Sequence, residues 1–434
     1  MKRELFYCDV RPKVVPADRE ATIEIRPRWD GGRFRPGQEF TVAHVMTEDT
    51  RTRPNSPVAW ERALAADADG VLRVHSFFEG EQEHVIRGVR FENSNGKNIA
   101  CDARLYSLRA DLLPRRPWKG DMHIHTCRSD GMEPPAYVAA AGRRIGLDFL
   151  AITDHHLYAP SLEAISAFSG VPHDLRIYPG EECHPNGIHI VNFGGRFGIT
   201  DLLKDPASQR EIETIRENLP LVRPGVDPAW AASTRWTFDK IREAGGLGVF
   251  CHPYWAFSEH YSLAEAYIEH IFETQPFDAF ELIGGFTRGE PESNLLQVIR
   301  YQEERARGRQ IPVIGCSDAH GCERGDLFGW YCTIVFSPSA ELSDLIASIK
   351  AGYSVAVEAL PGEQARPFGP FRLVKYALFL LREVMPLHDE LCAEEGRWMH
   401  RHAAGDADAA PALARAAGRC ARLYDALWAP ARGA

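Results

Sequence analysis

Histidine and carboxylate residues stand in two short motifs of this sequence at spacings that suit metal binding. His123 and His125 lie two residues apart and precede Asp130, and far along the chain Asp318 and His320 are again two apart. On an extended segment, side chains two apart point to the same side. Imidazole and carboxylate groups together suit Zn, Mn or Fe. The motifs therefore predict a metal site, provided that the fold brings them together.

Further candidates lie between the two motifs, at or near the ends of short apolar segments. With them, the candidate ligand set is His123, His125, Asp130, His155, Glu182, His189, His252, Asp318 and His320, and Asp154 accompanies His155. This set exceeds what one four-coordinate ion uses, so we expect two or three divalent ions, Zn, Mn or Fe. Such a centre produces hydroxide from water near neutral pH and neutralises charge on attacking and leaving oxygens. Neither a Gly-x-Ser-x-Gly motif nor a Gly-rich phosphate loop ending in Gly-Lys-Ser/Thr is present.

A lone histidine is more often a hydrogen-bonded core residue than a metal ligand, and this simpler interpretation applies elsewhere in the chain. We interpret His44, His75, His84 and His402 in this way, and His189 by itself would be interpreted so too. The metal prediction therefore rests on the whole set, which lies in order at the ends of predicted strands.

The segments that flank these candidates predict the elements that position them. Short apolar strands alternate with helix-like stretches, which favours an α/β fold with a parallel sheet, here interpreted as a distorted seven-stranded barrel. The strands are predicted at 119–125, 147–153, 175–179, 187–193, 247–251, 278–283 and 312–316, and helices at 135–145, 238–244, 264–272, 293–307 and 340–350. Because the carboxyl ends of parallel barrel strands share one face, the candidates would converge there.

The 434 residues exceed the usual size of one hydrophobic core, so we expect more than one domain. Residues 1–115 show β-rich runs separated by turn formers and predict a small β-sandwich. Residues 116–360 would form the barrel, and the prolines near 115 predict a linker before it. Residues 361–434 have helical spacing and predict a helical appendage.

Composition restricts the class of partner. The formal net charge of -10 argues against general nucleic-acid binding, which needs a basic face, but leaves a small anionic substrate open if metal supplies positive charge. No apolar run reaches the roughly 20 residues that span a membrane, and no signal peptide is evident, so we expect a cytoplasmic protein. The ten cysteines are scattered and predict buried apolar residues rather than disulfides. Homo-oligomerisation stays open.

With those residues in view, the chain from about Trp118 to Val357 resembles the PHP family, the polymerase and histidinol phosphatase superfamily of metal-dependent phosphoesterases. The resemblance lies in Gly120-Asp-Met-His123-Ile-His125-Thr with Ser129-Asp130-Gly131, Ile152-Thr-Asp154-His155, Gly180-Glu-Glu182, His252-Pro253 and Ser317-Asp318-Ala-His320. It implies a distorted seven-stranded β/α barrel. It also implies that the catalytic group is metal-bound hydroxide, supported by Asp318, His320 and Glu182.

The resemblance further implies how the ligands are shared. His123, His125, Glu182 and Asp318 would hold one ion, with Glu182 bridging. Asp130, His155 and His320 would belong to a neighbouring ion or its surroundings, and His189 and His252 to a third.

Two positions depart from the family pattern. His156 stands where Asn is common in the family. Glu181, next to Glu182, and the nearby His184 are alternatives to Glu182 as the metal ligand. The Trp-Lys-Gly-Asp before the first histidine, with a preceding β-domain, also resembles a subgroup that includes aryl carbamate hydrolases.

Substrate contacts are predicted from the residues near the motifs. Arg128 and Arg288 are candidates for bidentate phosphate binding, and Tyr254 and Trp255 could stack on a base or aryl group. The leading hypothesis is a phosphoesterase for a small phosphorylated metabolite or nucleotide. The alternatives are an ester, carbamate or amide hydrolase with the same metal site, and a non-catalytic metal-binding protein.

Overall fold

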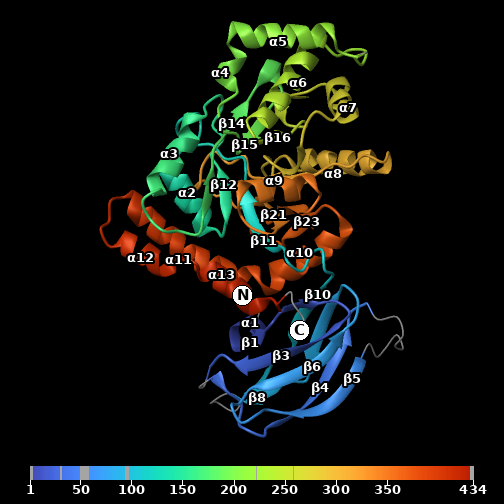
Figure 1. The fold of residues 1–434 in the computed structure, drawn as a ribbon, viewed down its shortest axis with the longest axis vertical. Helices are drawn as coiled ribbons and strands as arrows, with labels where there is room; N and C mark the ends of the chain where they lie inside the picture. The colour runs from blue at the N-terminus through green and yellow to red at the C-terminus, as the bar shows by residue number, and fades with distance from the viewer. Residues whose placement is uncertain are drawn as a thin grey trace. The chain divides into compact units, whose positions relative to one another are not determined.

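The structure, a computed structural model, describes residues 3–29, 32–48, 58–92, 97–220, 222–257 and 259–430. Two compact units are present (Figure 1). The first comprises residues 1–116, 378–388 and 418–434, and the second comprises residues 117–377 and 389–417.

Two β-sheets of the first unit share one core, and Arg90–Glu92 pairs with Asn98–Ala100 in a separate two-stranded sheet. The orders of the two sheets that share the core are β1-β3-β6 and β2-β10-β7-β4-β5. Buried side chains from both, such as Ile23 and Val74 on one sheet and Val42 and Leu105 on the other, pack in a single cluster, which is the arrangement of a β-sandwich. The strands are β1 (Cys8–Arg11), β2 (Val14–Pro16), β3 (Arg19–Pro27), β4 (Glu39–Met46), β5 (Val58–Ala65), β6 (Leu72–Phe78), β7 (Glu83–Arg87), β8 (Arg90–Glu92), β9 (Asn98–Ala100) and β10 (Ala103–Leu108), after a short helix α1 (Arg3–Tyr7).

A disulfide in this unit differs from the sequence expectation. Cys8 on β1 is joined to Cys101, which lies between β9 and β10, with their Cα atoms 6.2 Å apart. The two residues are far apart in sequence, so only the packing of the two sheets brings them together. Cys127, Cys183, Cys251, Cys316 and Cys322, beside the metal motifs, are free.

The second unit is built on two sheets. The first, in the order β13-β12-β11-β21-β22-β23, has parallel β11, β12 and β13 and antiparallel pairs among β21, β22 and β23. The second, in the order β14-β15-β16-β19-β20, is mixed. The first-sheet strands are β11 (Arg116–Asp121), β12 (Phe149–Ala151), β13 (Arg176–Tyr178), β21 (Tyr331–Ser337), β22 (Ser354–Glu358) and β23 (Arg366–Phe368). Those of the second sheet are β14 (Gly180–Cys183), β15 (Ile190–Phe193), β16 (Leu247–Phe250), β19 (Ala279–Gly284) and β20 (Val313–Cys316).

The fold is thus mixed α/β, but the closed seven-stranded barrel is not confirmed. All seven predicted strands are present, yet they are divided between two open sheets in the described part of the chain. In the second of these sheets, β14 pairs antiparallel with β15, as β15 does with β16. Where the two sheets approach, only isolated bridges form, between Ile124 and Ala319 and between His155 and Glu182. Those bridges join the segments that carry the metal motifs.

Helices surround these sheets. In the second unit they are α2 (Pro135–Arg144), α3 (Ala159–Phe168), the 3-10 turn η2 (Pro185–Gly187), α4 (Thr200–Leu203), α5 (Pro206–Glu217), α6 (Pro228–Glu243), α7 (Glu265–Thr274), α8 (Pro291–Ala306) and α9 (Leu342–Lys350), with a small hairpin of β17 (Ala256–Phe257) and β18 (His260–Tyr261). N-terminal capping residues in the sequence explain where some of these helices begin. In α6, for example, the Asp227 carboxylate accepts the Ala229 N–H at 2.9 Å and Pro228 occupies the first turn.

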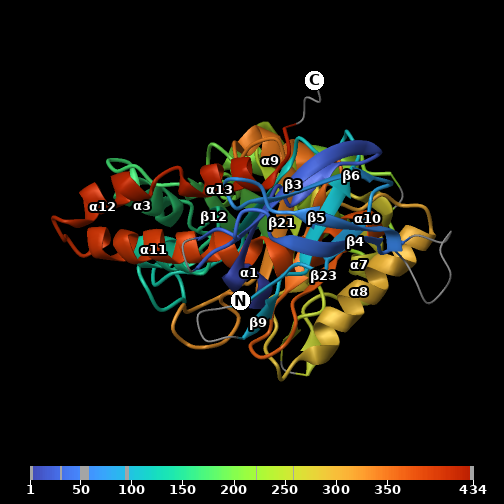
Figure 2. The ribbon, with the colours of Figure 1, turned by 90° about the horizontal axis from the view of Figure 1, so that it is seen from below.

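The C-terminal residues do not form one separate appendage. Their helices are α10 (Phe371–Glu383), α11 (Met385–Ala403), α12 (Ala409–Ala416) and α13 (Arg419–Leu427), and the two compact units share them. Residues 389–403 of α11 lie beside α2 and α3 (Figure 2), where Glu395 pairs with the buried Arg143 at 2.5 Å. Gly396 permits this approach, since an added Cβ would collide with the Arg144 backbone.

Candidate metal centre

The first histidine pair lies just after β11 and is fully buried. The Nε2 atoms of His123 and His125 lie 3.2 and 2.9 Å from Asp318 Oδ1. Each also lies 3.4 Å from Glu182 Oε2. Four side chains from three separate segments of the second unit therefore meet in one group, which could hold a metal ion. We call it group 1.

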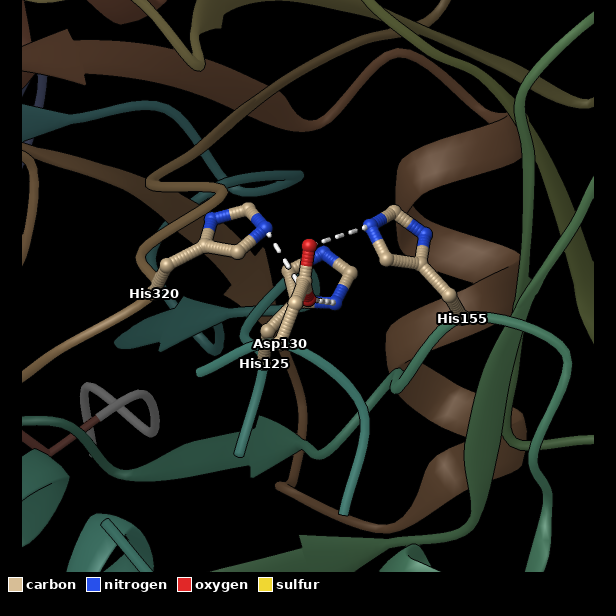
Figure 3. Close-up of side chains that lie close together, drawn as sticks. All are labelled: His125, Asp130, His155 and His320. Carbon is tan, nitrogen blue, oxygen red and sulfur yellow. Dashed lines mark ion pairs between the residues drawn. The ribbon is translucent and has the colours of Figure 1, made fainter. Parts of the chain in front are cut away.

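Asp130 forms the middle of a second group (Figure 3). Its carboxylate lies between His155 and His320, with Oδ2 3.4 Å from His155 Nε2 and Oδ1 3.4 Å from His320 Nε2. The Nδ1 atom of His125 is 3.9 Å from the same Oδ1, and the His125 and His320 rings stack with centroids 4.2 Å apart. These four residues are a second set of potential metal ligands, group 2.

The other oxygen of Glu182 faces two more histidines. Glu182 Oε1 lies 2.8 Å from His189 Nδ1 and 3.4 Å from His252 Nε2. His252 Nε2 is also 3.8 Å from Asp318 Oδ2. We call Glu182, His189 and His252 group 3. Glu182 thus contributes one oxygen to group 1 and the other to group 3, and every ligand candidate predicted from the sequence lies in one of the three groups.

The donor atoms of these groups fit divalent cations. Polar atoms buried without a hydrogen-bond partner include His123 Nε2, His125 Nδ1 and Nε2, both Glu182 oxygens, His189 Nδ1, His252 Nε2 and Asp318 Oδ1. Leaving so many polar atoms unpaired in the interior is costly unless another group satisfies them. A tetrahedral ion with ligands at about 2.0–2.1 Å places them about 3.3 Å from one another. The separations within group 1 are close to this value, so a cation is the partner that the geometry suits.

The histidines also keep the two central carboxylates charged. Burial alone would raise the pKa of Glu182, but His123 and His189 hold it well below its usual value. Burial opposes the charge on Asp318 as well, while His123, His125 and His252 lower its pKa. Both groups therefore present negative oxygens at neutral pH, as a cation site requires.

Two buried aspartates position the ligand segments without joining the groups. Asp121 Oδ1 accepts the backbone N–H of His123 at 3.2 Å and of Ser317 at 3.1 Å, so it joins the first and last motifs. Asp154 accepts the N–H and hydroxyl of Thr126 and of Ser129 at 2.6–3.2 Å, and so shapes the loop that carries Asp130. Asp154, the aspartate of the Thr-Asp-His motif, therefore stabilises the loop that carries Asp130.

Backbone strain accompanies the site. Asp318 and His156 have φ angles of 51° and 60°, in the left-handed region that non-glycine residues rarely occupy. Strained residues of this kind concentrate at functional sites, where the surrounding structure maintains them.

Glu281 is a further candidate site residue that the sequence analysis did not identify. It lies on β19, fully buried, with Oε2 2.9 Å from His123 Nδ1. A histidine that binds a metal through one nitrogen commonly donates its other N–H to a carboxylate, which fixes the ring. The signal was available, since a charged residue in the apolar run Ala279-Phe-Glu-Leu-Ile needs a buried partner.

The choice between the adjacent glutamates is resolved by their neighbours. Glu181 turns away from the histidines, and its carboxylate accepts the backbone N–H groups of Ile199 and Thr200. Glu182 faces groups 1 and 3. The one-residue alternative at this position is therefore disfavoured.

The predicted substrate-binding residues are engaged elsewhere. Arg128 donates two hydrogen bonds to Glu163, at 2.9 and 2.8 Å. Arg288 donates to the Pro361 carbonyl at 2.7 Å and lies over the Trp330 ring. Their assignment to phosphate binding therefore stays a prediction, and in this structure each arginine already has a partner.

The aromatic prediction also changes. Tyr254 is buried in the core cluster, and its hydroxyl accepts from Arg300 at 3.1 Å. Trp255 instead lies at the site, with its ring centroid 5.9 Å from that of His189 and 6.3 Å from that of His252. Of the two adjacent aromatic residues, Trp255 is therefore the one next to group 3.

Comparison with known proteins gives solved structures only. No family model and no curated protein matches the chain. A two-domain protein with a predicted PHP-like metal-dependent phosphoesterase from Bacteroides vulgatus is 15% identical, with a TM-score of 0.42, over 62% of this chain and 71% of that one. A protein assigned as a metal-dependent phosphoesterase from Bifidobacterium adolescentis is 19% identical, with a TM-score of 0.34, over 49% and 91%. An amidohydrolase from Chromobacterium violaceum with bound sulfate is 19% identical, with a TM-score of 0.29, over 46% and 87%.

Of these three structures, one is described as PHP-like, one as a metal-dependent phosphoesterase and one as an amidohydrolase. No helix in the described residues combines the length and the apolar character needed to cross a membrane.

Proposed function

We propose that this chain is a metal-dependent hydrolase of the PHP superfamily that holds two or three divalent ions and acts on phosphoesters. The observation that carries the proposal is the position of Glu182. Its two oxygens face different sets of unpartnered imidazole nitrogens, His123 and His125 on one side and His189 and His252 on the other. A carboxylate shared in this way suits neighbouring ions rather than a single structural one.

Each group would hold one ion. His123, His125, Glu182 and Asp318 would form the first position, Asp130, His155 and His320 the second, and Glu182, His189 and His252 the third. Bound ions of this kind activate water and neutralise charge on substrate oxygens.

The protein side chains have separate tasks in this proposal. Asp318 and Glu182 remain ionised in the interior and orient the histidines, while Glu281 fixes the His123 ring. His320, partly exposed beside Asp130, would present Nε2 to the second ion, because its Nδ1–H donates to the Asp318 carbonyl oxygen at 2.8 Å. Trp255 offers a flat apolar surface beside group 3 for the substrate's remaining part.

A second candidate is hydrolysis of a carboxylic ester, carbamate or amide by the same centre. The observation that favours it is the pairing of Arg128 with Glu163, which removes the nearest predicted cationic contact for a phosphate. A phosphoester would then depend on the ions to neutralise most of its negative charge. A neutral ester or carbamate carries no such charge and needs less neutralisation.

The test compares an aryl phosphate with an aryl carbamate of the same leaving group, on protein loaded with Mn or Zn. We expect faster turnover of the phosphate, and no turnover of either by His123→Ala. Faster cleavage of the carbamate would replace the leading proposal by the second. Stoichiometric metal binding without cleavage of either compound would contradict both and support a non-catalytic protein.

A further inference from the structure

His184 stands beside the metal groups without belonging to the ligand set predicted from the motifs. It follows β14 directly, two residues after Glu182, and its side chain is largely buried. Its Nε2 atom lies 3.1 Å from His155 Nδ1 in hydrogen-bonding geometry. The other nitrogen of His155 is the one that faces Asp130 in group 2.

Two groups face the Nδ1 atom of His155. Glu182 Oε2 lies 2.7 Å from it, although neither Glu182 oxygen has a hydrogen-bond partner by geometry. His184 Nε2 lies 3.1 Å from the same nitrogen. Which ring donates depends on the two tautomers, and His184 Nε2 is the acceptor when His155 carries its proton on Nδ1. Glu182 would then keep its oxygens for cations.

The surroundings of His184 hold its ring in this orientation. It stacks on His189 with centroids 3.7 Å apart and planes inclined by 12°. His156, in its strained left-handed conformation, contacts the same ring in a T-shaped arrangement with centroids 4.4 Å apart. Two neighbouring rings therefore restrict the orientation of His184, which is what a positioning contact to His155 requires.

From these contacts we propose that His184 is a positioning residue, which accepts the Nδ1–H of His155 and thereby directs His155 Nε2 toward the ion of group 2. A neutral histidine has one nitrogen that donates and one that accepts, so this hydrogen bond fixes the tautomer of His155. Through its stacking on His189, the same ring joins the segments of groups 2 and 3. The inference rests on the proposed metal centre.

The experiment measures ions per chain by elemental analysis at a fixed free Zn concentration, together with the visible spectrum of Co-loaded protein. His184→Ala should bind about one ion fewer, or bind it about 10–100-fold more weakly, and change the Co spectrum. His184→Gln, whose amide oxygen can accept the same N–H, should restore affinity to within about threefold of the natural chain. His260→Ala, which removes an exposed histidine of β18, is the matched control and should retain the metal content.

The outcomes separate this inference from the proposed function. If the natural chain binds no divalent ion, the metal centre itself is wrong. If it binds ions and folded His184→Ala binds them equally well, only the role of His184 is overturned. If His184→Gln folds normally but is as defective as His184→Ala, the positioning role is also overturned, because that result identifies His184 as a ligand.

Discussion

His123 Nδ1 and Glu281 Oε2 lie 2.9 Å apart, and both side chains are fully buried. The contact uses the nitrogen of His123 that does not face Glu182 and Asp318, so the Nε2 atom stays available to a cation. Glu281 on β19 thereby fixes the ring orientation of His123, a candidate ligand that lies after β11.

Replacing Glu281 by Gln should weaken metal binding while keeping the volume of the side chain. We expect a 10–100-fold loss of affinity, the usual cost of losing a carboxylate behind a ligating histidine. Zn titration with a competing chelator measures it. Glu303→Gln, on the exposed side of α8, serves as the control, and an unchanged affinity in Glu281→Gln would contradict the role assigned here.

Removal of a group 1 ligand should abolish catalysis and spare most of the fold. Asp318→Ala and His123→Ala each take away a donor atom that faces the proposed first ion. We expect turnover to fall more than about 100-fold, beyond the usual cost of an outer contact. Initial rates of the metal-loaded variants test this against His75→Ala, an exposed histidine of the first unit. Full activity in either ligand variant would rule out the site.

Loss of Asp154 should act through the loop rather than through a ligand. Its carboxylate receives hydrogen bonds from Thr126 and Ser129, and Asp154→Ala would leave these buried donors unpaired. We expect a loss of about 3 kcal/mol in unfolding free energy, and weaker binding of the ion near Asp130. Calorimetry of the metal-free protein and metal titration measure the two effects. Asp154→Asn keeps one acceptor oxygen, so its stability and its metal affinity should lie between those of the natural chain and those of Asp154→Ala.

The buried histidine pair of the first unit predicts a pH-dependent stability. His44 contacts Ser76 and His84, and His84 contacts Ser107. Burial, followed by Arg62, lowers the pKa of His44 to about 4, and burial, followed by His44, lowers that of His84 to about 3. Both values lie below the usual 6.5, so the unfolded chain takes up protons first as the pH falls.

Stability contributed by these neutral rings is therefore present above pH 6.5 and is lost as the pH falls toward 4. The loss should be on the order of a few kcal/mol. Calorimetric melting of the first unit between pH 7 and 4.5 measures it, and His84→Gln should show a shallower dependence on pH. Equal slopes for the two proteins would refute the assignment.

Arg128 should matter little for the substrate, contrary to its sequence-based assignment. Because both of its hydrogen bonds go to Glu163, Arg128→Ala should change KM for an aryl phosphate by less than about twofold. Steady-state kinetics decide the matter, with Glu163→Gln as the companion variant. A tenfold rise in KM for Arg128→Ala alone would mean that the arginine leaves Glu163 and contacts the phosphate.

Several features could be predicted from the sequence because they depend on local pattern. The alternation of short apolar strands with helices predicts the α/β unit, since strand and helix periods are properties of neighbouring residues. The types and spacing of His123, His125, Asp318 and His320 predict cation chemistry, because few other sites need imidazole and carboxylate together. Those residues do lie within reach of one another.

Other features were decided only by the tertiary structure. The expected barrel strands are divided between two sheets, and β14 pairs antiparallel with β15. The direction of that pairing cannot be derived from a four-residue strand. Side-chain partners also depend on packing. Arg128 meets Glu163, Glu281 meets His123, and His184 meets His155, although nothing in their sequence separation predicts these contacts. Local sequence determines which chemistry is available, while the direction of each side chain follows from long-range contacts that form only when the chain folds.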